Sequence, residues 1–203
     1  MEKSSDSDLV QPMNDENAPT DAAPSGSGPS LFSFALVWLR DLTLSLIIAC
    51  VVILFIYQPV QVEGTSMMPG LVDQERIFIN KFTYRFGIEK IERGDTVVFW
   101  YLDDRSRSYI KRVIGLPGEE IRIDRGTVYV NGSPLSEDYV PPEYRDEFSM
   151  NPVVVKQDHY FVLGDHRTSS NDSRAWGEGI PRDHIYGKAV FVYWPPEKIG
   201  PVQ

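Results

Sequence analysis

Hydrophobic residues are spread unevenly along the chain. Residues 1–30 contain few large apolar side chains, and an apolar run begins abruptly at Leu31. Apart from the adjacent pair Arg40 and Asp41, this run continues without charge to Tyr57. The contrast predicts a long apolar helix after a polar beginning.

The apolar run is long enough to cross a membrane. Residues 42–60 would rise about 28 Å as a helix, close to the roughly 30 Å hydrocarbon core of a bilayer. We therefore predict a transmembrane anchor over residues 31–60, in which residues 31–39 either lie along the membrane surface or extend a tilted helix. A buried core helix is the alternative. Arg40 on the N-terminal flank favours a cytoplasmic N-terminus under the positive-inside rule.

After Met67 the pattern changes to short segments rich in Val, Ile, Phe and Tyr, separated by turn signals. It predicts a mainly β fold of antiparallel sheets over residues 61–203. Residues 139–152 contain three prolines and are expected to form an irregular loop. The clearest hairpin turns at Asp124-Arg125-Gly126. The expected strands are residues 76–80, 96–101, 108–114, 121–123, 127–130, 159–163 and 185–194.

Composition limits the domain count. With 203 residues, 42% of them hydrophobic, the chain can hold one domain with a core besides the anchor and a tail. The tail, residues 1–30, carries six acidic residues against one basic residue, Lys3. It cannot bury enough apolar surface to offset its chain entropy, so we predict that it is disordered. Because it lacks the basic start of a cleavable signal peptide, the apolar run is interpreted as a retained anchor.

Charge and cysteine content argue against a nucleic-acid partner and against a disulfide within the chain. The formal net charge of -9 argues against a nucleic-acid partner, which requires a basic surface. Cys50 is the one cysteine in the sequence, so an intramolecular disulfide is not possible.

A candidate nucleophile lies a few residues after the apolar run. Ser66 stands among small and turn-forming residues in the segment 64–70, just outside the predicted anchor. A serine in such a segment is more often a turn residue than a nucleophile. Ser66 therefore needs a partner that could activate it.

Histidine is the usual partner of a serine nucleophile. The chain has three histidines, His159, His166 and His184. Because a Ser/His/Asp triad is defined by geometry and not by order in the chain, Ser66, His166 and Asp172 could converge.

Lysine offers a second way to activate the serine. Lys111 lies on an expected strand whose two faces are both largely apolar, next to Arg112. An arginine cannot lose its proton in a protein, whereas a buried lysine can become a neutral amine. Lys111 is therefore the better candidate for a general base, and a lysine that reaches water at the strand edge is the alternative.

Four segments, in order and after an anchor, resemble the signature segments of the bacterial type I signal peptidases (leader peptidases, serine protease family S26). They are GTSMMP at residues 64–69, RGDTVVF at 93–99, YIKRVIGLPGE at 109–119 and GDHRTSSNDSR at 164–174. The resemblance extends from about Leu31 to Lys198. It implies a membrane-anchored catalytic β domain of the fold that signal peptidases share with repressor-type proteases.

The resemblance also implies a Ser/Lys dyad. Ser66 would be the nucleophile and neutral Lys111 its general base. Ser170 would orient the lysine amine, and Asp172 and Arg174 would form a supporting ion pair. Asp165, Arg167 and Ser173 would hold the same loop. No cofactor and no metal are expected.

The substrates that the resemblance implies are signal peptides of exported preproteins, cleaved after small residues in an Ala-X-Ala pattern. Met67, Leu71, Tyr109 and Ile110 would line the substrate pockets, with core packing as the alternative for each. The expected location is the plasma (inner) membrane, with one crossing and the catalytic domain on the outer face. The lipid bilayer is thus a partner, and the enzyme is expected to be a monomer.

Two positions depart from the pattern of the family. Gly64 stands where some members carry a serine that donates to the oxyanion, which leaves the Ser66 backbone N–H as the defined donor. His166 stands where asparagine is usual, and its role is open.

Other functions remain possible from the sequence. A membrane-anchored β module could bind extended peptides without cutting them, and a Ser/Lys autoprotease of the repressor type would share the dyad. Four aromatic residues could rest the domain on the bilayer or pack in its core: Phe78, Phe82, Phe99 and Trp100.

Overall fold

The computed structural model describes residues 31–82, 89–177 and 179–202. The predicted disordered tail, residues 1–30, lies outside these described residues. The chain divides into two compact units between Leu44 and Ser45, within the first helix.

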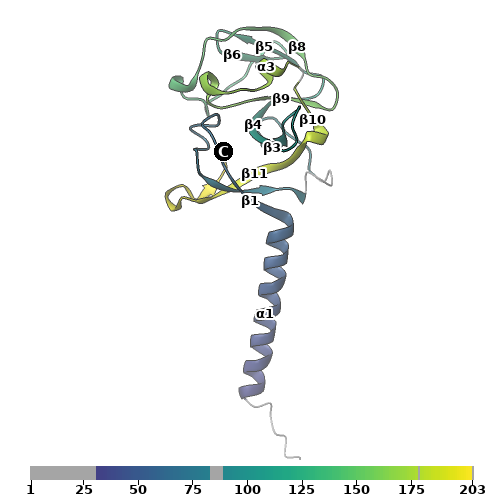
Figure 1. The fold of residues 1–203 in the computed structure, drawn as a ribbon, viewed down its shortest axis with the longest axis vertical. Coiled ribbons are helices and arrows are strands. Elements are labelled where there is room, and N and C mark those ends of the chain that lie inside the picture. The colour runs from purple at the N-terminus through teal and green to yellow at the C-terminus, as the bar shows by residue number, and fades with distance from the viewer. Residues whose placement is uncertain (1–30, 83–88, 178, 203) are drawn as a thin grey trace, which may run out of the picture. The chain divides into compact units, whose positions relative to one another are not determined.

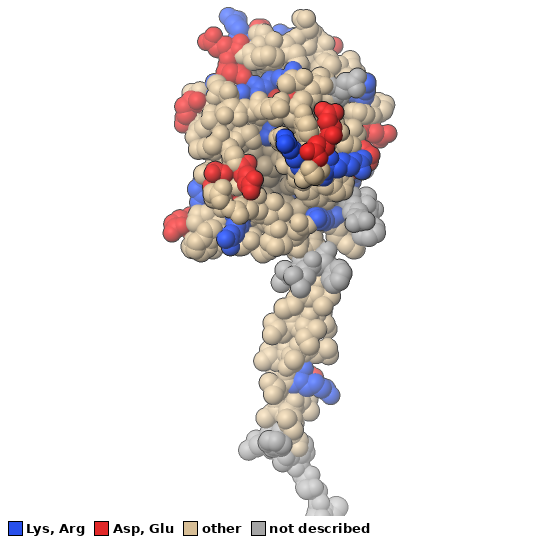
Figure 2. Space-filling model, viewed as in Figure 1, with Lys and Arg blue, Asp and Glu red and all other residues tan. Residues whose placement is uncertain are grey.

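Helix α1, Leu31–Ile56, contains the expected apolar run. Its segment Ser33–Val52 is long and apolar enough to cross a membrane. The helix continues through Arg40 and Asp41, whose side chains form an ion pair of 2.8 Å between Nη2 and Oδ1. Figure 2 shows an otherwise uncharged surface along the described part of this helix. Residues 31–39 therefore extend the helix, which is one of the two arrangements that we considered.

The expectation that the helix reaches residue 60 was wrong. Residues Tyr57–Gln61 form strand β1, which pairs with β2 from Tyr57 opposite Asn80 to Gln61 opposite Arg76. Pro59 has no backbone N–H to donate within a helix and is tolerated on an edge strand. The apolar composition that predicted a helix thus continues into a sheet.

The larger sheet is eight-stranded and antiparallel. Its order is β1-β2-β11-β3-β4-β9-β10, and β12 pairs with β11. Besides β1, the strands are β2 Arg76–Asn80, β3 Thr96–Trp100, β4 Ser108–Gly115, β9 His159–Leu163, β10 Ile180–Pro181, β11 Ile185–Trp194 and β12 Gly200–Pro201. Adjacent positions in this sheet bring together segments that are far apart in the sequence, such as β2 and β11.

The smaller sheet is four-stranded, in the order β7-β6-β5-β8. Its strands are β7 Ser133–Pro134, β6 Thr127–Val130, β5 Glu120–Asp124 and β8 Met150–Val154. Figure 1 shows β5, β6 and β8 at the end of the β unit away from β1. The predicted hairpin is confirmed, since Ile121 lies opposite Val130. Residues 139–152 are less irregular than expected, because they include a 3-10 turn, η1 (Pro142–Tyr144), and the start of β8.

The core confirms the mainly β fold. Alternate residues of β2 are buried, with Ile77 and Ile79 packed against Val98 of β3 and Val192 of β11. Strands β3 and β4 are buried over most of their length, as expected for the centre of a sheet.

Of the four aromatic residues considered for bilayer contact, Phe99 is fully buried in the core. Phe82 is 41% exposed, and Phe78 and Trp100 are half-buried. Membrane contact is therefore excluded for Phe99 by its packing.

Short helical turns occupy the loops that follow the strands. Asp172 caps the short helix α3 (Ser173–Trp176) by accepting a hydrogen bond from the backbone N–H of Arg174, as aspartate commonly does at an N-cap. The 3-10 turns in this part of the chain are η2 Arg167–Ser169, η3 Arg182–His184 and η4 Pro196–Lys198.

Candidate active site

Ser66 lies in a tight turn between β1 and β2. Gly64 starts the turn with a φ of 92°, a conformation that favours glycine, and its N–H donates to Asp73 Oδ1 over 2.8 Å. The Met68 N–H donates to the Thr65 carbonyl over 3.1 Å. The side chain of the following residue, Met67, is buried in the core, whereas that of Ser66 is only partly buried. The turn thereby fixes the backbone on both sides of the serine.

Lys111 reaches the serine from strand β4. Its side chain is 2% exposed, and its Nζ lies 2.7 Å from Ser66 Oγ. The same nitrogen lies 2.9 Å from the Ile110 carbonyl oxygen, to which it donates. A nucleophile and a base within about 2.6–3.2 Å of each other have the separation that proton transfer requires.

The environment of Lys111 favours the neutral amine. Burial lowers the pKa of Lys111 from its usual 10.5 to about 8, against the opposing effect of the carboxylates of Asp172 and Asp165. The nearby guanidinium of Arg174 adds to the lowering of this pKa. With a pKa of about 8, about 10% of Lys111 is neutral at pH 7 and can accept a proton.

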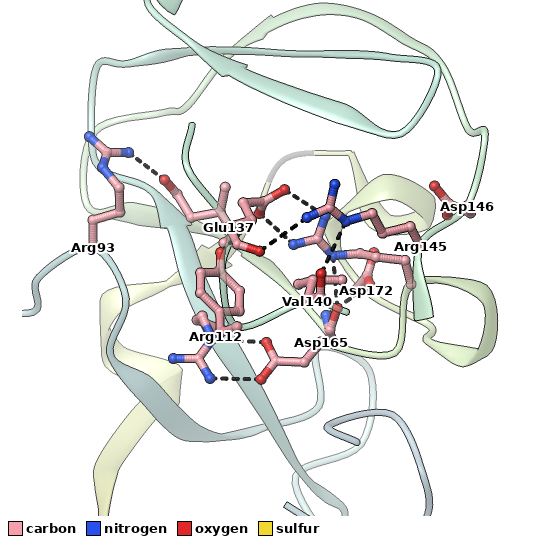
Figure 3. Close-up of polar contacts among 12 residues, drawn as sticks. Arg93, Arg112, Glu137, Val140, Arg145, Asp146, Asp165 and Asp172 are labelled. Atoms are coloured by element: carbon pink, nitrogen blue, oxygen red, sulfur yellow. Dashed lines mark hydrogen bonds and ion pairs between the residues drawn. The ribbon is translucent and has the colours of Figure 1, made fainter. Parts of the chain in front are cut away.

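The loop after β9, residues 164–174, is joined to β4 by a buried ion pair. Asp165 accepts from Arg112 Nε over 2.8 Å and from Arg112 Nη2 over 2.7 Å, in the two-pronged geometry typical of arginine and carboxylate. Figure 3 shows these two parallel contacts. Since Arg112 follows Lys111 in β4, the ion pair ties the loop to the strand that carries the lysine.

Asp172 is held from two sides. It accepts from the Gly164 N–H over 3.1 Å and from Arg174 Nε and Nη2 over 2.8 Å and 2.9 Å. The expected ion pair between Asp172 and Arg174 is therefore present, and the carboxylate is almost fully buried. Arg174 Nη2 also donates to the Arg167 carbonyl over 2.8 Å, which closes the loop on itself.

Two acidic residues of this network were missed by sequence reasoning. Glu137, in the segment after β7, pairs with Arg167, and Asp146, before β8, pairs with Arg174. Both lie in the connection between strands β7 and β8 of the smaller sheet, far from the loop in sequence, and neither stands in a recognisable motif. Only the packing of the two sheets brings them to the arginines.

Gly164 is a further residue that the sequence did not single out. A Cβ at this position would overlap the hydroxyl of Ser170 and the backbone oxygen of Ser66. The glycine therefore permits the loop to approach the nucleophile closely. The Ser170 hydroxyl is buried and has no hydrogen-bond partner among the described residues, Lys111 included.

The histidines do not form a triad with Ser66. The Nδ1 atom of His166 lies 3.2 Å from the Thr65 carbonyl oxygen, and Asp172 is engaged by Arg174 and Gly164. His159 and His184 contact other backbone carbonyls, those of Gln157 and Trp100. Among the described contacts, Lys111 is the basic group that reaches the Ser66 hydroxyl.

A groove of about 720 Å³ runs past Ser66. One wall is the segment 60–66 and the other is the segment 106–111, with Ile77 and Val98 between them. Tyr109 and Ile110 line this groove, as expected for substrate-binding residues. Met67 and Leu71 lie instead in the buried core, each 1% exposed, which is the packing alternative that the sequence left open.

Within the described residues, no group of three or more His, Cys, Asp or Glu side chains is placed to hold a metal ion. What the site offers is a serine hydroxyl against a buried amine, in a groove on a β fold. This is the arrangement of a hydrolase that works through an activated serine.

Comparison with known proteins gives the family. A family model described as "Signal peptidase, peptidase S26" matches residues 35–194. Signal peptidase I of Leptolyngbya laminosa is 35% identical over 88% of this chain and 89% of its own length. A probable signal peptidase I-2 of Synechocystis is 38% identical over 79% of this chain and 74% of its own length, and signal peptidase I of Bacillus licheniformis is 34% identical over 80% and 90%. Among solved structures, a signal peptidase I of Enterococcus faecalis V583 is 32% identical, covers 49% of this chain and 97% of its own, and has a TM-score of 0.43.

The family match covers more than half of the chain. The chain therefore belongs to the signal peptidase family, peptidase S26, and is a hydrolase of peptide bonds.

Proposed function

We propose that this chain is a membrane-bound serine endopeptidase that removes signal peptides from exported preproteins, with Ser66 as nucleophile and neutral Lys111 as general base. The observation that carries the proposal is the distance of 2.7 Å between Ser66 Oγ and the Nζ of a lysine that is 2% exposed. Its relatives are named signal peptidase I, which supports the same substrate class.

The reaction begins with proton transfer. As Ser66 Oγ attacks the carbonyl carbon of the scissile bond, Lys111 Nζ takes the hydroxyl proton. The resulting ammonium gives a proton to the leaving amine, and the acyl-enzyme is then hydrolysed by water that Lys111 deprotonates. The contact with the Ile110 carbonyl holds the amine in place while Ser66 reacts.

The negative charge on the substrate oxygen needs a donor. Gly64 has no side chain to supply one, so the backbone N–H of Ser66 is the donor that we assign. The loop residues Asp172 and Arg174 support the dyad by fixing the backbone at Gly164. In this proposal Ser170 turns its hydroxyl to the Lys111 amine during the reaction and orients it. The hydroxyl is buried and, in the described part of the chain, makes no hydrogen bond that would hold it elsewhere.

The substrate would bind as an extended strand. Strand β9 pairs with β4 from Arg112 onward, so the stretch of β4 before it borders the groove, and β1 is an edge strand of the sheet. An extended peptide between these edges would form main-chain hydrogen bonds. Tyr109 and Ile110, with the floor of the groove, would leave room for small side chains, which favours the Ala-X-Ala pattern.

We further propose a single membrane crossing by α1, with residues 1–30 on the cytoplasmic side. The catalytic domain, residues 61–203, would then work on the outer face of the plasma membrane. The enzyme is proposed to act as a monomer, since both members of the dyad come from one chain.

The test measures cleavage of a preprotein with an Ala-X-Ala site in detergent and compares the unmodified full chain with its variants. Ser66→Ala and Lys111→Ala are each expected to abolish cleavage. Thermal denaturation curves should show that both variants are still folded. Lys90→Ala, which changes an exposed lysine outside the site, is the matched control and should cleave normally.

Normal cleavage by Lys111→Ala would rule out the dyad. If the unmodified chain neither cleaves the substrate nor is acylated at Ser66 by a serine-reactive inhibitor, a membrane-anchored module that binds extended peptides is the better description.

A further inference from the structure

His166 makes contacts that the proposed chemistry has not yet used. It follows Asp165 in the loop after β9, and its backbone N–H donates to the Ser66 carbonyl over 3.1 Å. Its ring nitrogen Nδ1 lies 3.2 Å from the Thr65 carbonyl oxygen. Because a carbonyl oxygen only accepts, this nitrogen must carry a proton. One residue therefore binds the carbonyl groups on both sides of the Ser66 backbone nitrogen.

The geometry of the peptide bond links the Thr65 carbonyl to the Ser66 N–H. The Thr65 carbonyl and the Ser66 N–H belong to the same planar peptide unit and point in opposite directions when the bond is trans. A donor that fixes the direction of the carbonyl thereby fixes the direction of the N–H. Hydrogen bonding to the carbonyl also polarises the unit and strengthens the N–H as a donor.

The Thr65 carbonyl has a second partner, the Met68 N–H at 3.1 Å, which belongs to the turn itself. That contact closes the turn but does not connect the Thr65–Ser66 peptide plane to the rest of the site. His166 connects this plane to strand β4, because the neighbouring residue Asp165 is bound to Arg112, next to Lys111.

We propose that His166 is a positioning residue for the oxyanion donor: its imidazole aligns the Thr65–Ser66 peptide unit so that the Ser66 N–H points at the substrate oxygen in the transition state. This inference rests on the proposed function and deepens it. It carries most weight in this chain because Gly64 offers no side-chain donor that could compensate.

A purely structural role for His166 makes a different prediction. The ring also packs edge-on against Tyr144 of η1, with ring centroids 4.7 Å apart and planes at 87°. Loss of that packing would loosen the loop and affect folding and substrate binding in every variant that lacks an aromatic ring at this position. The two roles are separated by replacing the donor and the ring independently.

His166→Phe keeps an aromatic ring near Tyr144 and removes the donor. His166→Asn removes the ring and keeps an N–H donor at the δ position of the side chain, and His166→Ala removes both. Since the alignment matters in the transition state, we expect lower kcat with an unchanged KM. The loss of one neutral hydrogen bond corresponds to a decrease of about 2- to 10-fold in kcat.

The experiment measures kcat and KM for a peptide with an Ala-X-Ala site, using the full chain in detergent. We expect His166→Phe and His166→Ala to lower kcat by about 2- to 10-fold and His166→Asn to retain near-normal kcat. His159→Phe is the matched control, because this histidine contacts the Gln157 carbonyl, outside the groove lining.

Unchanged kcat in both His166→Phe and His166→Ala would overturn the inference. So would equal losses in the Asn and Ala variants, or losses expressed in KM, because these results indicate packing. If the Phe variant does not fold, the comparison of Asn with Ala decides, since the two differ in the donor and both lack the ring. A Ser66→Ala variant assayed alongside distinguishes failure of the proposed function from failure of the positioning role. Full activity of Ser66→Ala would overturn the proposed function itself. An inactive Ser66→Ala variant together with normal His166 variants would overturn only the positioning role.

Discussion

Replacing Lys111 by methionine should stabilise the protein while it abolishes activity. Burial lowers the pKa of Lys111 from 10.5 to about 8. At pH 7 the charged amine is therefore less stable in the folded protein than in the unfolded chain. This difference corresponds to about 3 kcal/mol of lost stability at pH 7. Methionine has a similar length and no charge, and it gives up the hydrogen bonds to Ile110 and Ser66, worth about 1 kcal/mol each. We therefore expect the free energy of unfolding to rise by about 1 kcal/mol at pH 7.

The sign of the pH dependence follows from the same pKa. Between pH 8 and 10.5 the unfolded chain binds more protons at this lysine than the folded chain does. The free energy of unfolding therefore rises with pH in this window, and the penalty is fully present below it. In Lys111→Met this contribution is absent, so the gain over the unmodified protein should shrink toward pH 10.5.

The assay is denaturant unfolding of the full chain in detergent, followed by tryptophan fluorescence at several pH values. Lys90→Met, at an exposed lysine, is the control and should change stability by less than about 0.5 kcal/mol. A Lys111→Met variant that is less stable at pH 7, with the pH dependence of the unmodified protein, would refute the claim that burial of the amine costs stability.

Two substitutions test the packing around the dyad. Gly164→Ala places a Cβ against the Ser170 hydroxyl and the Ser66 backbone oxygen, so we expect a loss of about 100-fold in kcat, measured by peptide cleavage. Retention of full activity would mean that the loop can move away without cost. Leu71→Ala should lower the free energy of unfolding by about 2–5 kcal/mol in denaturant titrations and leave KM unchanged, because Leu71 is buried in the core. A changed KM with normal stability would instead indicate that Leu71 lines the substrate pocket.

Much of the fold could be predicted from local sequence pattern. The bounds of β2, β6, β9 and β11 match the expected strands, because β-branched and aromatic residues there end at clear turn signals. Strands β1 and β8 were missed, since each contains a proline and neither has a continuous apolar pattern. Their pairing depends on neighbouring strands that only tertiary structure provides.

The candidate site was predictable where residues carry their own chemical signature. Ser66 and Lys111 were candidates from the turn composition and the strand pattern, the resemblance to the signal peptidases implied that they form a dyad, and they lie in contact. Glu137 could not be found in this way, because an acidic residue in a loop is ordinary until its arginine partner is known. Gly164 was missed for a related reason, since the close approach that demands glycine exists only in the folded chain.

The central claim is that a neutral Lys111 activates Ser66, and the pH dependence of kcat/KM tests it most directly. With a pKa of about 8, the neutral fraction of Lys111 would be about 10% at pH 7 and about 90% at pH 9. We predict that kcat/KM for cleavage of an Ala-X-Ala peptide rises about 10-fold between these two pH values and then levels off. A profile that is half-maximal near pH 6.5 and level above about pH 7.5 would contradict the account, because it would indicate a histidine as the base.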